Sequence, residues 1–77
     1  MKAYLHDKIP GETPTETTHF WFVATEERAL LYATREKAQS DCTVLNREPV
    51  QMDDGTQVRD FKVEQSADKF VIFGLKS

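Results

Sequence analysis

Apolar residues occur along the chain in runs of different spacing, and these spacings predict its elements. Residues 19–25, HFWFVAT, are aromatic and β-branched, a composition typical of a β-strand. Alternation would place Phe20 and Phe22 on one face. Trp21 and Val23 would then lie on the other face. Because both faces are apolar, we expect this strand to lie centrally in a sheet, with Trp21 partly shielded by strands, by an N-terminal arm or by a partner.

The next segment, ATEERALLYATREKA, contains two possible helix starts, Thr25 and Thr34. A start at Thr25 would give one helix of about twenty residues, and the good helix propensity of EERALLYATREKA supports it. A start at Thr34 would leave residues 29–33, ALLYA, as a strand paired with residues 19–25. Five apolar neighbours point all around a helix axis but line both faces of a strand, so we favour the hairpin followed by a helix.

After Thr34 the apolar spacing becomes helical. Ala38, Cys42 and Leu45 form one narrow stripe, which predicts a helix with a single buried face. The hydroxyl of Thr34 can accept a hydrogen bond from a free amide in the first turn. The helix is expected to end near Asn46, a suitable residue for a left-handed C-terminal position.

The remaining apolar runs predict strands in residues 2–6, on both sides of Asp54–Gly55, and in residues 61–65 and 69–75. The Asp54–Gly55 pair is typical of a two-residue hairpin turn, where positive φ is needed. The run from 70 to 75 is continuously apolar, so it is expected in the middle of the sheet. The alternation slips by one residue near Arg59 or Asp60, which predicts a β-bulge.

These elements predict an α+β fold: a small two-layer sandwich with an antiparallel sheet of about four to six strands and one α-helix packed on one face. A chain of 77 residues has room for one domain and one modest core, so residues 1–77 are expected to form a single domain. Residues 7–18, DKIPGETPTETT, are polar with two prolines and a glycine. We expect them to form a flexible or partner-contacting loop.

The expected sheet carries more aromatic surface than one short helix can cover. The helix offers chiefly Ala38, Cys42 and Leu45, whereas the chain contains five Phe, two Tyr and one Trp. Each aromatic side chain buries about 150–250 Å². We therefore expect the second sheet face to be shielded by a loop, by a second copy of the chain, or by another protein.

Charge and cysteine usage narrow the functional classes. Thirteen acidic and ten basic side chains are interspersed and give a net charge of -3, which argues against a nucleic-acid binder and is too mild for a DNA mimic. Cys42 is the only cysteine, so no internal disulfide forms and the thiol is expected to be buried. The start MKAYLHD has no apolar stretch long enough for a signal peptide, and nowhere do eighteen apolar residues run together. We therefore expect a cytoplasmic protein with no membrane partner.

No residue pattern indicates catalysis. A nucleophile needs a base within hydrogen-bonding reach, but Cys42 lies in the apolar stripe, and His6 and His19 share no motif. Zinc and calcium sites need ligand spacings that the chain lacks, and its isolated glycines cannot build a phosphate-binding loop. We expect no enzymatic activity, no cofactor and no metal.

A non-enzymatic protein-binding module, acting as an inhibitor or adaptor, is the expected function. The chain resembles in size, charge and fold class the small phage or mobile-element proteins that act by binding a host machine, a group that includes anti-CRISPR proteins. This resemblance implies docking on another protein, but it rests on no motif and transfers no residue. A regulatory subunit of a bacterial complex would have the same features.

The residue types that carry most interface energy are Trp, Tyr and Arg. The candidate partner-binding residues are therefore Trp21, Tyr32, Tyr4 and Arg35. A simpler interpretation places the aromatic residues in the core, and a homodimer would also cover them. The alternative function is an accessory domain that contacts nucleic acid through Arg35, Lys37, Arg47 and Lys62.

Overall fold

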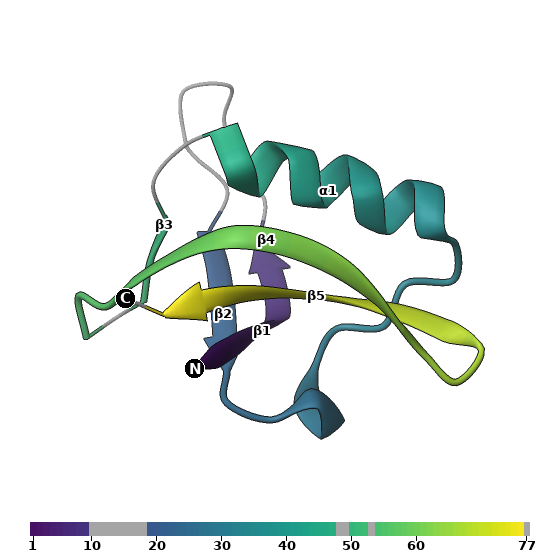
Figure 1. Cartoon of the computed structure of the whole chain (residues 1–77), viewed down its shortest axis with the longest axis horizontal. Coiled ribbons are helices and arrows are strands. Elements are labelled where there is room, and N and C mark those ends of the chain that lie inside the picture. Colours follow the sequence, from purple (N-terminus) through teal and green to yellow (C-terminus); the bar gives the residue numbers. More distant parts are fainter. Residues whose placement is uncertain (10–18, 48–49, 53, 77) are drawn as a thin grey trace.

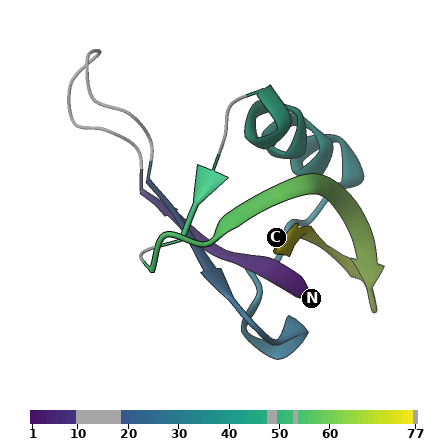
Figure 2. The ribbon, with the colours of Figure 1, turned by 60° about the vertical axis from the view of Figure 1, so that its left-hand side comes forward.

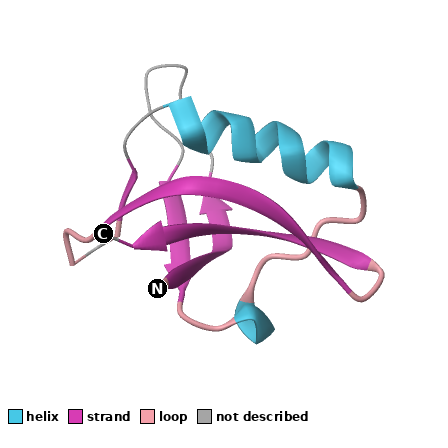
Figure 3. Cartoon of the chain, viewed as in Figure 1, coloured by secondary structure: helices cyan, strands magenta, loops and turns pink. Residues whose placement is uncertain are grey.

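A computed structural model of the chain shows a five-stranded antiparallel sheet with one α-helix packed against it (Figure 1). It describes residues 1–9, 19–47, 50–52 and 54–76. The elements are β1 (Lys2–Ile9), β2 (His19–Val23), the 3-10 helix η1 (Glu26–Arg28), α1 (Arg35–Arg47), β3 (Val50–Gln51), β4 (Gln57–Ser66) and β5 (Lys69–Lys76). Their order in the sheet is β2-β1-β5-β4-β3. The predicted α+β fold is confirmed (Figure 3).

Strand β5 lies in the middle of the sheet, as its continuous apolar run predicted. It pairs with β1 on one side and with β4 on the other. Both Val71 and Ile72 are fully buried although they point to opposite faces. A strand covered on both faces needs apolar residues at every position, which explains the run.

The inner core lies between α1 and the sheet. The predicted stripe of Ala38, Cys42 and Leu45 is buried there, whereas Val44 at its margin is 47% exposed. The sheet contributes Ala3, Leu5, Val58, Phe61 and Ile72. One face of α1 is therefore enough to anchor it across the sheet.

Curling of the sheet covers much of the aromatic surface that the sequence left to a partner. In Figure 2, β4 arches over the other strands. The rings of Phe22 on β2 and Phe61 on β4 have centroids 5.7 Å apart, although β1 and β5 separate their strands within the sheet. Twist and bulges bring the two ends of the sheet together. The expected excess of uncovered rings was therefore too large, because the sheet itself covers part of them.

A second, smaller apolar cluster lies on the outer face of the sheet. Its members are Tyr4, Ala29 and Val71, with Val23 and Phe73 packed against them. The 3-10 helix η1 brings Ala29 to this face, and the Nδ1 of His6 donates a hydrogen bond to the carbonyl of Arg28. A loop therefore supplies part of the cover for the second face.

Thr34 is the residue that starts the helix. The backbone N–H of Lys37 donates to the Thr34 hydroxyl at 3.3 Å, and α1 begins at Arg35. The long helix from Thr25 is therefore wrong. At the other end, the prediction that Asn46 adopts a left-handed conformation is also wrong, because α1 continues to Arg47 and positive φ among the described non-glycine residues occurs elsewhere.

Residues 29–33 do not form a hairpin with β2. After η1 this segment crosses the molecule, and the N–H of Leu30 donates to the carbonyl of Leu5 at 2.7 Å. Tyr32 and Phe70 then form an isolated antiparallel bridge. The apolar run divides between layers, with Ala29 in the outer cluster and Tyr32 in the inner core. Periodicity alone could not distinguish this crossing segment from a strand.

Strand β2 is confirmed as a strand, but not as a central one. It pairs with β1, which occupies one side, and lies at one end of the described sheet. Strand β1 extends beyond the predicted residues to Ile9. It therefore includes residues 7–9 of the expected loop, whose remainder, 10–18, lies outside the described residues.

The β-bulge is confirmed where the alternation slips. The β4–β5 register shifts between Arg59 and Lys62, and Asp60 has φ of 57°. The side chain of Asn46 makes two hydrogen bonds with the β4 backbone beside the bulge. Its Nδ2 donates to the Phe61 carbonyl at 3.1 Å, and its Oδ1 accepts from the Phe61 N–H at 2.9 Å. These two bonds satisfy the backbone N–H and C=O of Phe61 beside the register shift.

The hairpin around Asp54–Gly55 is confirmed, although its loop is longer than two residues. The N–H of Met52 donates to the carbonyl of Thr56 at 2.8 Å, which leaves three residues between them. Gly55 has φ of 87°, as the turn requires. Asp54 Oδ1 accepts the N–H of Thr56 at 2.9 Å, a side-chain turn that accommodates the extra residue.

At Gly74, β5 packs closely against side chains of β4. A Cβ at this position would lie 2.6 Å from Val58 Cγ1 and 2.7 Å from a ring carbon of Phe61. We expect Gly74→Ala to lower the free energy of unfolding by about 1–3 kcal/mol through overpacking, measured by urea denaturation. The cost should shrink in a Val58→Ala background, which makes room. An unchanged unfolding midpoint would contradict the close approach.

The pair of hydrogen bonds between the Asn46 side chain and the Phe61 backbone, which we call the clamp, is expected to stabilise the bulge. Asn46→Ala removes both hydrogen bonds and is expected to cost about 1–2 kcal/mol, even though alanine favours a helix. Amide hydrogen exchange of Phe61 should accelerate in the variant. Thr43→Ala, which removes a hydroxyl bonded to the Gln39 carbonyl on the exposed helix face, is the control. Equal effects of the two substitutions would show that the clamp does not stabilise the bulge.

Candidate functional site

The four predicted contact residues lie in different parts of the molecule. Tyr4 belongs to the outer cluster and Tyr32 to the inner core, where they are 8% and 6% exposed. Arg35 is exposed at the start of α1, with its guanidinium 4.9 Å from the ring centre of Phe70. Trp21 is 40% exposed on β2. Two of the four thus serve packing, and the other two present their side chains on the surface.

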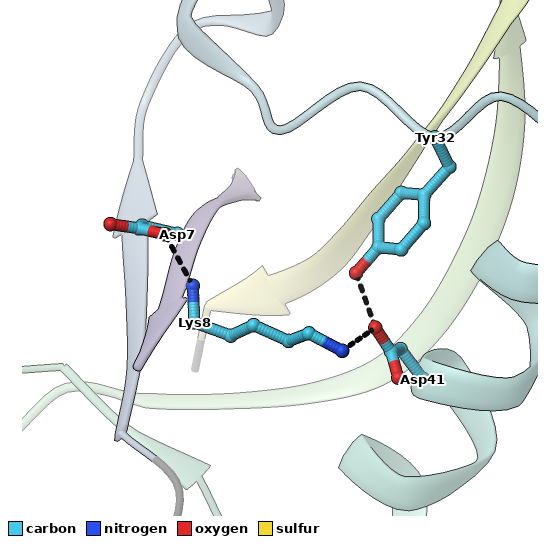
Figure 4. Close-up of polar contacts among 4 residues, drawn as sticks. All are labelled: Asp7, Lys8, Tyr32 and Asp41. Carbon is cyan, nitrogen blue, oxygen red and sulfur yellow. Dashed lines mark hydrogen bonds and ion pairs between the residues drawn. The ribbon is translucent and has the colours of Figure 1, made fainter. Parts of the chain in front are cut away.

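A polar network connects β1, α1 and the segment of residues 29–33, which we call the crossing segment (Figure 4). The hydroxyl of Tyr32 donates to Asp41 Oδ2 at 2.7 Å, and the Nζ of Lys8 donates to the same oxygen at 2.6 Å. The backbone N–H of Lys8 donates to the carboxylate of Asp7 at 2.8 Å. Residues far apart in sequence are thereby held around one carboxylate.

The network holds its members in their unreactive forms. Burial opposes ionisation of Asp41, but hydrogen bonds from Lys8 and Tyr32 and the charges of Lys8 and Lys37 lower its pKa overall. Burial, followed by the bond and charge of Asp41, raises the pKa of Tyr32 well above 10. A carboxylate with a lowered pKa is a poor base and a neutral phenol a poor nucleophile at neutral pH. The arrangement stabilises the fold.

The other chemically versatile residues are used in a similar way. Burial raises the pKa of the Cys42 thiol, which disfavours the reactive thiolate. The ring of His6 bonds to the Arg28 carbonyl, whereas the carboxylate of Asp7 accepts the Lys8 N–H. Within the described ranges, no three His, Cys, Asp or Glu side chains cluster as metal ligands would.

The basic residues of the nucleic-acid alternative are spread over two elements. Arg35 and Arg47 are the first and last residues of α1, about 18 Å apart along its axis. Lys37 lies near the start of α1, beside the acidic Glu36, and Lys62 lies on β4. The helix therefore presents both signs of charge.

A recess lies where the curl brings β2 towards the β3–β4 turn. Its volume is about 200 Å³, and its described lining residues are Phe20, Trp21, Phe22, Met52 and Asp54. We call it the edge recess. Phe20, Phe22 and Met52 are half-buried and pack against the inner core. The recess therefore presents an apolar surface, packed against the core, beside the exposed Trp21.

Among the described lining residues of the edge recess, Asp54 is the charged one. The hydrogen bond from Thr56 is the main cause that lowers the pKa of its carboxyl, and the charge of Lys76 adds to this. The carboxylate is therefore ionised at neutral pH. Sequence reasoning did not connect Met52 and Asp54 with Trp21, because only the curl brings these distant segments together.

A second recess, about 390 Å³ in volume, lies between the end of α1 and the bulge of β4. Leu45, Val58 and Phe61 form its apolar part. Charged residues of both signs line it as well, namely Arg47, Arg59 and Asp60. Its polar character is mixed, and Asn46 beside it already binds the β4 backbone.

Comparisons with protein-family models, with curated proteins and with solved structures found no match. Among the described residues, the helices are too short or too polar to cross a membrane.

The network around Asp41 predicts a pH dependence of stability. Because the pKa of Asp41 is lowered on folding, its contribution is complete above the ordinary value of 3.8 and is lost as the pH falls through the lower folded value. Asp41→Asn should cost about 1–2 kcal/mol at pH 7. It should also flatten the acid limb of a plot of stability against pH. Urea denaturation from pH 2 to 7 measures both effects.

The exposed Asp68 in the β4–β5 turn provides the matched control. Asp68→Asn makes the same chemical change outside the network and should leave the acid limb unchanged. If Asp41→Asn has a profile parallel to that of the wild type, Asp41 does not carry this contribution.

Proposed function

We propose that the chain is a small non-enzymatic protein-binding module, an inhibitor or adaptor that docks on a partner through the edge recess. The observation that carries this proposal is the position of Trp21, which is 40% exposed beside a recess lined by Phe20, Phe22 and Met52. A large aromatic side chain next to a half-buried apolar pocket has the composition of an interface anchor.

The edge recess is a better docking surface than the wider sheet. Most rings expected to need a partner are covered by the curl, by α1 or by η1. The half-buried residues of the edge recess already pack against the inner core, so a partner would meet a partly ordered surface. Binding to such a surface requires less ordering of side chains than binding to a mobile one.

The proposed site is narrower than the set of residues chosen from sequence. Trp21 keeps its contact role. Tyr4 and Tyr32 are assigned to packing because their side chains are buried. Arg35 is exposed, but its guanidinium lies over Phe70 at the start of β5, and we do not place it in the recess.

Charge supports a protein over a nucleic acid as the partner. The carboxylate of Asp54 lines the recess, and the chain carries a net charge of -3. Both repel a phosphate backbone. A second copy of the chain is a possible partner of the same class, and a homodimer is one outcome of the test below.

Photo-crosslinking from the proposed contact point tests this function. Trp21 is replaced by p-benzoylphenylalanine, the protein is expressed in its source cells, and products are identified by mass spectrometry after irradiation. We expect one discrete crosslinked protein, or a dimer of the chain. The same replacement at Thr43 on the exposed face of α1 should give neither. Absence of a product specific to position 21, or crosslinks only to nucleic acid, would contradict the proposal.

Once a partner is identified, affinity provides a quantitative check. Trp21→Ala is expected to weaken binding by about 10- to 100-fold, the range for a central aromatic anchor. Thr43→Ala should change the dissociation constant by less than about twofold. Isothermal titration calorimetry measures both constants.

A further inference from the structure

We propose that the edge recess binds a cationic side chain, a lysine or arginine of the partner protein, with its alkyl part against the apolar lining and its charged end beside Asp54. This inference rests on the proposed function, since it specifies the group that the partner inserts. It follows from the chemistry of the described lining residues, which combine aromatic rings, a thioether and the carboxylate of Asp54.

The apolar lining suits the stem of a long basic side chain. Lysine and arginine pack their methylene groups on apolar surface and keep the charged end at the rim. Phe20, Phe22 and Met52 provide that surface, and methionine adapts its shape to the occupant. The volume of about 200 Å³ is below the usual range of about 300–1,000 Å³ for small-molecule sites. It fits one side chain better than a cofactor.

The aromatic and acidic groups favour a positive charge. A cation is attracted to the face of an aromatic ring within about 6 Å, most strongly to tryptophan. The protein uses this contact elsewhere: the Nζ of Lys2 lies 4.3 Å from the ring centre of Phe73, and the guanidinium of Arg35 lies 4.9 Å from that of Phe70. At the recess, the rings lie beside a carboxylate, which adds a direct charge partner.

The carboxylate of Asp54 has the capacity to accept this partner. Its Oδ1 accepts the N–H of Thr56, and an ionised carboxylate has further acceptor positions. The charge of Lys76 acts on Asp54, but the ion pairs within 4.0 Å among the described residues are Lys2–Glu64 and Lys8–Asp41. Asp54 is therefore not neutralised by a direct contact with a described cation.

Intrinsic fluorescence provides a direct assay, because Trp21 is the only tryptophan and lines the recess. The probes are acetyl-Gly-Arg-Gly-amide and the same peptide with citrulline, which keeps the shape of arginine but carries no charge. A glutamate peptide provides the opposite charge. We expect a saturable fluorescence change for the arginine peptide, with an affinity at least about threefold higher than for the citrulline peptide.

Matched variants assign the preference to Asp54. Asp54→Asn keeps an oxygen that can accept the Thr56 N–H but removes the charge, so the preference for arginine over citrulline should disappear. Asp68→Asn removes an exposed charge at the other end of β4 and should leave it intact. Lys76→Gln removes the competing cation and should strengthen binding of the arginine peptide.

Three results would overturn the inference. The first is equal binding of the arginine and citrulline peptides, and the second is a preference for arginine that Asp54→Asn leaves unaffected. The third is no saturable fluorescence change up to about 50 mM peptide, 50-fold above the dissociation constant of about 1 mM at the weak end of specific binding. Its failure is distinguishable from failure of the proposed function. A partner crosslinked at position 21 that presents no basic residue to the recess would remove the inference alone. The absence of any crosslinked partner would remove the proposed function.

Discussion

The structure depends on the attachment of α1 to the bulge of β4. Asn46 exchanges two hydrogen bonds with the backbone of Phe61, beside the register shift between β4 and β5. The ring of Phe61 is thereby held in the inner core, close to Gly74 and facing Phe22 from the distant strand β2. A bulge increases local twist and bends a strand. Here, that bend lets a five-stranded sheet cover its own aromatic residues with the help of only thirteen helical residues.

The same curl creates the edge recess. Strand β2 and the β3–β4 turn belong to opposite ends of the sheet, and in a flat sheet they would lie about 15–20 Å apart. Bringing them together places Trp21 and Asp54 around one small volume. Strand edges are prone to unspecific pairing, whereas a recess lined by side chains selects its occupant by shape and charge. The contact surface that we propose therefore requires neither a cofactor nor a large cavity.

Hydrogen bonds and burial set the charge states of three titratable residues beside the inner core. Asp41 is held ionised by Lys8 and Tyr32, while Tyr32 and Cys42 are held neutral chiefly by burial. The Asp41 carboxylate of α1 connects the helix with Lys8 of β1 and with Tyr32 (Figure 4). It adds a side-chain attachment to residues 29–33, whose backbone joins the sheet at Leu30–Leu5 and at the bridge between Tyr32 and Phe70. A polar network of this kind stabilises one particular arrangement of apolar segments that could pack in several ways.

The sequence by itself determined the local features of this protein. The cap at Thr34, the buried stripe of α1, the bulge near Asp60 and the central position of β5 all follow from capping chemistry or from apolar spacing over a few residues. Tertiary structure decided the course of residues 29–33, the edge position of β2 and the extent to which the rings are covered. It also brought Asp54 to Trp21. These features depend on strand pairing and on the curvature of the whole sheet, which sum over contacts between distant residues and leave no periodic signal in any one segment.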